Sequence, residues 1–178
     1  KSIVLQAVSK NGYELRYASA ALKDDRDVVL AAVMQTGYVL EHASDRLQDD
    51  EEIATLAALH KGASLEHVST ELRNKKSIIL KAVSKNSYAL SYASDALKDD
   101  REIVLKAVKK DGHALRHASA RLKDDEEIVT LALSNGGSLE HVGTELRGKK
   151  SIVLQAVSEE KFELNYASDA LKDDRDVV

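Results

Sequence analysis

Apolar residues recur along the chain in two alternating patterns, and the pair of patterns repeats every 25 residues. The first is a broad stripe at helical spacing, such as the apolar residues between Val28 and Val33. The second is a leucine–alanine–leucine pattern with steps of three and four residues, as in Leu40, Ala43 and Leu47. Both spacings are typical of amphipathic helices, so we predict two short helices of roughly ten residues in each copy.

The chain divides into seven copies of one repeat, which we number from 1 to 7, with positions 1 to 25 inside each copy. The sixth copy is one residue short, and its later positions are numbered by alignment with the other copies. The repeats span residues 1–25, 26–50, 51–75, 76–100, 101–125, 126–149 and 150–174, and residues 175–178 begin another copy. Repeats 1, 4 and 7 resemble one another, as do repeats 3 and 6, so a block of about 75 residues was duplicated after the single repeat. We predict one continuous array over residues 1–178.

Neither predicted helix is long enough to be stable alone, because isolated helices need about 12–15 residues. The repeats must therefore stack and bury their apolar stripes against one another. We predict an all-α fold, an α-solenoid of tandem two-helix repeats in triplets. A closed helical bundle that arose by duplication is the alternative, and the stack is favoured because it reuses a single interface.

Polar residues at the repeat boundaries predict where helices begin and end. An aspartate three residues before a second acid, as in Asp24 and Asp27, is close to the capping-box spacing,. We expect this first aspartate to cap the long helix and the next one to be a solvated turn residue. Gly12, Gly37, Gly62, Gly112 and Gly137 are predicted to end that helix in the left-handed conformation,. Ser87 and Lys161 replace this glycine and predict strain there or another geometry,.

Repeats 3 and 6 depart from the common pattern. Their leucine moves from position 5 to position 6, at Leu56 and Leu131, which predicts a rotated apolar stripe,. The acidic boundary sequence becomes "RNKK" at Arg73–Lys76 and "RGKK" at Arg147–Lys150. We expect these repeats to change the local twist of the array.

Composition excludes several function classes. The net charge of −4 and an aromatic content of 4% without tryptophan argue against nucleic acid or an anionic membrane as a partner,. The chain has no cysteine, hence no disulfide or thiolate site, and no run of apolar residues long enough to predict a membrane-spanning helix,. No signal peptide is visible, and the cellular compartment stays unknown.

Histidine and tyrosine share position 17 of every repeat and form a candidate interaction or stacking ladder. Its members are Tyr17, His42, His67, Tyr92, His117, His141 and Tyr166. Such a column could bind metal or relay protons, but stacked helices lie about 8–10 Å apart, too far for adjacent imidazoles to share one ion. We interpret it as a half-buried packing position and predict no metal and no cofactor.

Charged residues at the repeat boundaries form a candidate charge stripe that is acidic, acidic and basic through each triplet. It comprises Asp24, Asp25, Asp49, Asp50, Lys75, Lys76, Asp99, Asp100, Asp124, Asp125, Lys149 and Lys150. A similar aspartate pair is present at Asp173–Asp174. The pairs lack the loop pattern of a calcium site, and a group that recurs in every copy favours structure over catalysis. The stripe serves either solubility or contact with a partner, which includes lateral contact between arrays.

The stretch "DREIVLKAVKKDGHALRHASARLKDDEEIV" at 100–129, with its copies throughout the chain, resembles a "domain of unknown function" family. The repeats of that family read D-R-E-V-V-L-x-A-V-x-x-x-G-x-x-L-x-x-A-S-x-x-L-[KR]-x-D, in proteins of protists, giant viruses and some intracellular bacteria. The resemblance implies an all-helical repeat architecture and brings no catalytic residues.

These patterns predict a structural helical-repeat protein that offers an extended surface to another protein. A self-assembling filament subunit is one alternative, and an accessory region of an enzyme or effector whose catalytic part lies elsewhere is another. We expect no catalysis by these residues. The octet "LKDDRDVV" joins two repeats at 22–29 and recurs at 171–178, so we expect the array to extend further,.

Overall fold

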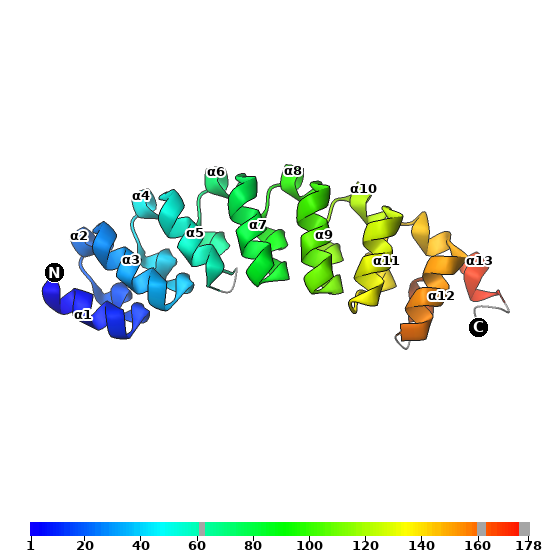
Figure 1. Cartoon of the computed structure of the whole chain (residues 1–178), viewed down its shortest axis with the longest axis horizontal. Coiled ribbons are helices and arrows are strands. Elements are labelled where there is room, and N and C mark those ends of the chain that lie inside the picture. The colour runs from blue at the N-terminus through cyan, green and yellow to red at the C-terminus, as the bar shows by residue number, and fades with distance from the viewer. Residues whose placement is uncertain (61–62, 160–162, 175–178) are drawn as a thin grey trace. The chain divides into compact units, whose positions relative to one another are not determined.

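The computed structural model describes residues 1–60, 63–159 and 163–174, and this part of the chain contains helices and turns but no strand (Figure 1). The predicted all-α repeat fold is confirmed. The chain forms two compact units, Lys1–Ser94 and Asp95–Val178. A single continuous array through both units stays a prediction.

The N-terminal unit consists of three kinds of helix in a repeating order. The long α-helices are α1 (Ser2–Lys10), α3 (Arg26–Gln35), α5 (Glu51–Leu59) and α7 (Lys76–Lys85). Each is followed by a 3-10 helix, namely η1 (Gly12–Tyr17), η2 (Gly37–His42), η3 (Ala63–His67) and η4 (Ser87–Tyr92). One-turn α-helices complete the first three repeats: α2 (Ala20–Lys23), α4 (Asp45–Gln48) and α6 (Thr70–Arg73).

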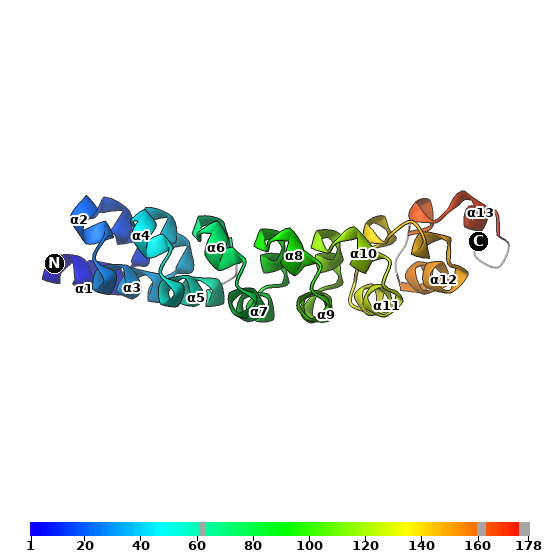
Figure 2. The ribbon, with the colours of Figure 1, turned by 90° about the horizontal axis from the view of Figure 1, so that it is seen from above.

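The C-terminal unit has the same order of elements. It begins with the one-turn helix α8 (Asp95–Lys98). Its long helices are α9 (Arg101–Lys110), α11 (Glu126–Ser134) and α12 (Lys150–Glu159). Its short helices are η5 (Gly112–His117), α10 (Ala120–Lys123), η6 (Leu139–His141), η7 (Leu146–Gly148), η8 (Glu163–Tyr166) and α13 (Asp169–Lys172). Within each unit the long helices form one layer and the one-turn helices lie in the other (Figure 2).

The core of each unit lies between these two layers. Positions 3, 4, 7 and 8 are buried in α3, α5, α7, α9 and α11, as predicted; Val28, Val29, Ala32 and Val33 of α3 are fully inaccessible to solvent, whereas Ile3 of the first long helix is exposed. Position 15 of the repeat, which lies in the 3-10 helix and is Leu40 in repeat 2, is equally buried. Burying a side chain of this size contributes about 1.5–3 kcal/mol, so most of the stability of a repeat comes from contact with its neighbours.

The prediction of a second ten-residue helix is wrong. In repeat 2 the 3-10 helix η2 ends at His42, and Ala43 and Ser44 adopt extended backbone conformations before α4 begins. The extended break turns the Ser44 amide to the preceding repeat, where it donates to the Lys23 carbonyl at 3.0 Å. The leucine–alanine–leucine spacing persists because all three residues face the core, although the backbone between them is not one helix.

The assignment of the cap to the first aspartate is wrong by one residue. In four of the pairs the second aspartate is the N-cap: Asp50 accepts from the amides of Glu52 and Ile53, both at 3.0 Å. Asp25, Asp100 and Asp125 have the same role. The first aspartate instead joins two repeats, since Asp24 accepts from the Ser44 hydroxyl and from Arg46 Nε at 3.0 Å. It is therefore not a free turn residue.

The regular spacing of glycine at the end of the long helix has a steric cause that differs from the predicted one. Gly136 is the one described glycine with positive φ, at 79°. A Cβ on Gly112 would lie 1.9 Å from the Ala132 carbonyl oxygen, and one on Gly12 would lie 2.5 Å from that of Ala32. The glycine thus allows close approach of the next long helix. Asn86, which precedes Ser87, has nearly the same backbone conformation as Asn11, which precedes Gly12, so Ser87 begins its 3-10 helix with the same geometry as the glycine. Lys161 and Gly62 lie outside the described residues.

The predicted rotation of the stripe in repeats 3 and 6 is also wrong. Ile128, Val129, Ala132 and Leu133 of α11 are buried at the usual positions, and Leu131 is only partly buried. The real change in repeat 6 lies at Gly143, which replaces the serine of the extended break. A Cβ there would lie 2.1 Å from the carboxylate of Asp124, which accepts from the Leu146 amide at 3.2 Å. Asp124 therefore caps the turn that a serine caps elsewhere, as Ser119 does for Leu122.

Candidate interaction surface

The position-17 residues lie where each 3-10 helix ends, in the layer of short helices. In the N-terminal unit these are Tyr17, His42, His67 and Tyr92, and in the C-terminal unit His117, His141 and Tyr166. Tyr17 is 69% exposed and Tyr166 is 37% exposed, whereas the others are half-buried. Consecutive 3-10 helices are in contact within each unit, so the structure brings the members of each group into a row. Their role as a ladder for a partner stays a prediction.

The charged groups near the imidazoles at position 17 differ between the two units. In the N-terminal unit, Glu41 lies 3.6 Å from His42 Nε2, and Glu66 lies 3.0 Å from His67 Nε2. Burial raises the pKa of Tyr92 and the negative charge of Glu66 adds to this effect. Carboxylates thus accompany the imidazoles of this unit.

In the C-terminal unit the neighbours of the imidazole at position 17 are mostly cations. Arg116 Nε donates to His117 Nε2 at 3.0 Å, which requires a neutral imidazole,. Burial lowers the pKa of His117 to about 4, and the positive charges of Arg116, Lys98, Lys123 and His141 act in the same direction,. Burial also lowers the pKa of His141, although the carboxylate of Glu140 opposes this.

Many residues of the charge stripe form ion pairs that join the start of one long helix to the start of the next. Position 1 of one repeat pairs with position 25, the residue that caps the next long helix: Arg26 with Asp50 at 3.2 Å, and Arg101 with Asp125 at 3.2 Å. The polarity is reversed where repeats 3 and 6 end. There Lys75 pairs with Glu51 at 2.7 Å, Lys149 with Glu126 at 2.6 Å, and the next repeat restores the first polarity with Lys150 and Asp174 at 2.9 Å.

Because both members of the pair change sign together, each of these junctions still joins opposite charges. The Lys1 ammonium group lowers the pKa of Asp25. Burial alone would raise the pKa of Asp50, but the Ile53 amide and Arg26 bring it below its usual value. The carboxylate of Glu51 in turn raises the pKa of Lys75.

The remaining aspartates of the charge stripe form hydrogen bonds. Asp49 accepts from the Ser69 hydroxyl, Asp99 from the Ser119 hydroxyl and Arg121, and Asp100 from the amides of Glu102 and Ile103. Lys76 is the first residue of α7.

Two equivalent clefts open between consecutive repeats in the layer of short helices. One, of about 320 Å³, lies between repeats 2 and 3, and the other, of about 350 Å³, lies between repeats 6 and 7. Positions 20 and 23 of one repeat and positions 17 to 20 of the next line both. The first includes Asp45, Gln48, Glu66, His67, Val68, Ser69, Thr70 and Arg73; the second comprises Thr144, Arg147, Tyr166, Ala167, Ser168 and Asp169.

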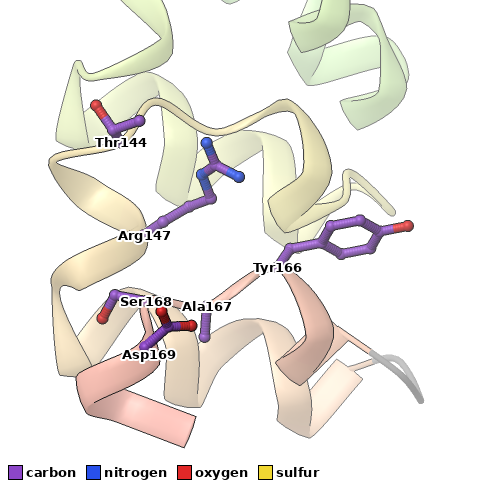
Figure 3. Close-up of a pocket in the computed structure, with 6 residues that line it drawn as sticks. All are labelled: Thr144, Arg147, Tyr166, Ala167, Ser168 and Asp169. Carbon is purple, nitrogen blue, oxygen red and sulfur yellow. The ribbon is translucent and has the colours of Figure 1, made fainter.

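Sequence reasoning missed the cations at position 23. Figure 3 shows the side chain of Arg147 extending between Thr144 and Tyr166. The signal was present in the sequence, because Lys98, Lys123 and Arg147 occupy position 23 of three consecutive repeats. What the sequence did not show is the extended break after position 17, which places the next repeat beside this position.

Among the described residues, no group of three or more histidine and acidic side chains is close enough to hold a metal ion. In the same part of the chain, no helix has both the length and the apolar character that a membrane crossing requires.

Comparison with known proteins identifies a family. The profile described as "Domain of unknown function (DUF4116)" matches residues 1–48, 50–98 and 100–147. Each match spans about two of the 25-residue repeats. Neither the curated proteins nor the solved structures contain a significant match to the chain. The three matches together cover well over half of the sequence, so the chain belongs to the DUF4116 family of tandem helical repeats.

Proposed function

We propose that this structural repeat protein acts as a scaffold that binds another protein along its layer of short helices. The observation that carries the proposal is the recurrence of one cleft at equivalent junctions in both units. A surface that repeats with the fold suits a partner that makes the same contact several times, as is usual for stacked helical repeats. Clefts with tyrosine, histidine and arginine also have the composition that protein interfaces favour.

The use of the ionisable groups supports the same proposal. Their contacts join consecutive repeats or the starts of consecutive long helices: Asp24 pairs with Ser44, Arg26 with Asp50, and Glu51 with Lys75. These contacts recur from junction to junction, whereas a catalytic centre depends on one distinctive set of side chains. We therefore propose that binding, and not catalysis, is the role of these residues.

Affinity capture from the native source, with three versions of the whole chain as bait, tests the proposal. The wild-type chain is compared with the double variant Arg147→Ala, Tyr166→Ala in the second cleft. The matched control is Met34→Ala, which removes a large side chain that is 61% exposed on α3, in the other layer. We expect a stoichiometric partner that the control retains and the cleft variant loses.

Equal capture by the wild-type and cleft variants would contradict the proposed surface. Sedimentation velocity at several concentrations covers self-assembly: a sedimentation coefficient that rises steadily with concentration would identify a filament subunit instead of a scaffold for a different protein.

A further inference from the structure

Three consecutive cations of the C-terminal unit lie on a row that backbone hydrogen bonds fix. The Ser119 amide donates to the Lys98 carbonyl at 3.0 Å, the Gly143 amide to the Lys123 carbonyl at 2.8 Å, and the Ser168 amide to the Arg147 carbonyl at 3.1 Å. Each position-23 residue is therefore tied to the next repeat. The row Lys98–Lys123–Arg147 has the spacing of the repeats, which is about 8–10 Å for packed helices.

One further positive group accompanies this row. Arg116 at the end of η5 lies close enough to His117 for its charge to act on that neutral imidazole together with the charges of Lys98 and Lys123. Burial lowers the pKa of Lys123, and no opposite charge raises it. No ion pair of the Lys98, Lys123 or Arg147 side chains is recorded among the described residues. The cation row thus presents positive charge that the junction contacts do not neutralise.

Resting on the proposed function, we propose that the row Lys98–Lys123–Arg147 binds an extended acidic segment of the partner protein. An extended chain in the polyproline II conformation has three residues per turn and advances about 3.1 Å per residue, so carboxylates at every third residue lie on one face about 9 Å apart and match the spacing of the cations. Arginine and lysine at the row can each form charge-assisted hydrogen bonds with one carboxylate. The cleft beside Arg147 leaves room for the backbone of such a segment between repeats 6 and 7.

A carboxylate-bearing chain fits this surface better than a nucleic acid. The whole chain carries 30 acidic and 26 basic residues, so a long polyphosphate meets net repulsion away from the row,. Glu140 and Asp169 flank the row, and the carboxylate of Asp169 pairs with Lys172 at 3.2 Å. A short peptide segment needs contact with the three cations alone, so it meets less of this repulsion than a long polyphosphate does.

Fluorescence anisotropy with the full chain tests this inference. The probe is a labelled peptide with end groups blocked, containing three glutamates separated by two glycines each. A second peptide has the same composition with the glutamates adjacent, and a third probe is a single-stranded oligonucleotide of similar length. We expect the spaced peptide to bind severalfold more tightly than the clustered peptide and the oligonucleotide, with an affinity that falls as salt is added.

The variant Lys123→Gln, Arg147→Gln should weaken binding of the spaced peptide by about five- to tenfold. The matched control Lys106→Gln, Lys109→Gln removes two exposed charges from α9 in the other layer and should change binding less than twofold,. Thermal unfolding of both variants shows whether the fold is retained. Equal weakening by the two variants, equal binding of the two peptides or tighter binding of the oligonucleotide would overturn the inference. If the capture experiment still gave a cleft-dependent partner, the scaffold proposal would stand without it.

Discussion

At the scale of single residues, the first aspartate of a boundary pair connects two repeats at Asp24, Asp49, Asp99 and Asp124, and its partner varies with the next repeat. Asp24 accepts from the Ser44 hydroxyl, whereas Asp124 faces Gly143 and accepts from the Leu146 amide itself. The loss of one hydroxyl is therefore compensated inside the same junction. Asp124 performs the capping that serine performs in repeats 2, 3 and 5.

This exchange predicts a coupling between Asp124 and Gly143. Asp124→Ala should lower the free energy of unfolding by about 1–2 kcal/mol, because the Leu146 amide loses its acceptor. In a Gly143→Ser background the same substitution should cost less, because the new hydroxyl can accept from that amide. Urea denaturation of the four proteins measures the coupling; identical costs in both backgrounds would show that Asp124 does not replace the serine.

His117 makes stability depend on pH. Its pKa in the folded protein is about 4, below the ordinary value of 6.5, so the unfolded chain binds more protons between these values. Stability is therefore full above pH 6.5 and falls as the pH is lowered toward 4, by about 1–2 kcal/mol once solvent screening of the half-buried ring is allowed for.

The variant His117→Gln isolates this contribution. We expect the unfolding free energy of this variant to depend less on pH between pH 4 and 6.5 than that of the wild-type chain. His141 is present in both proteins, so its contribution does not affect the comparison. Curves that stay parallel through this range would show that His117 is not held neutral by its surroundings.

At the scale of elements, the caps and ion pairs of the long helices act together. Where repeat 3 ends, Lys75 replaces the capping aspartate and makes no side-chain bond to the helix α7. A lysine also lies unfavourably at the positive end of a helix. Its pair with Glu51 at 2.7 Å offsets part of this cost.

The charge reversal predicts that Glu51 and Lys75 can be exchanged only together. Glu51→Lys alone brings two cations together and should lower the free energy of unfolding by about 0.5–1 kcal/mol. The double variant Glu51→Lys, Lys75→Asp copies the junction of Lys1 and Asp25 and adds an N-cap, so it should be as stable as the wild-type chain or up to about 1 kcal/mol more stable. Additive effects in a double-mutant cycle would contradict the pairing.

The sequence was sufficient to predict the long helices and insufficient to predict the segments between them. The buried positions of α3 were predictable because a ten-residue helix shows its stripe at regular spacing. The break at Ala43 and Ser44 was not, because Leu40, Ala43 and Leu47 keep helical spacing while the intervening backbone turns toward the Lys23 carbonyl. That bond to another repeat has no signature in local spacing, and the cleft beside it was hidden for the same reason.

At the scale of the whole chain, membership of the repeat family and the two units of matching design describe a protein built from one reused junction. The junction contains the buried stripe, the aspartate connector, the ion pair and the cleft. Since the first three hold consecutive repeats together, the cleft is the part that is available to a partner. We therefore place the proposed binding function in the layer of short helices.

Hydrogen exchange of the chain bound to a stoichiometric partner purified from the native source tests this placement most directly. We expect the partner to slow exchange in the short-helix segments, above all η5 and α10 with residues 139–148, and to leave the long helices α9 and α11 unchanged. Protection concentrated in α9 and α11, with none in the short-helix layer, would contradict it.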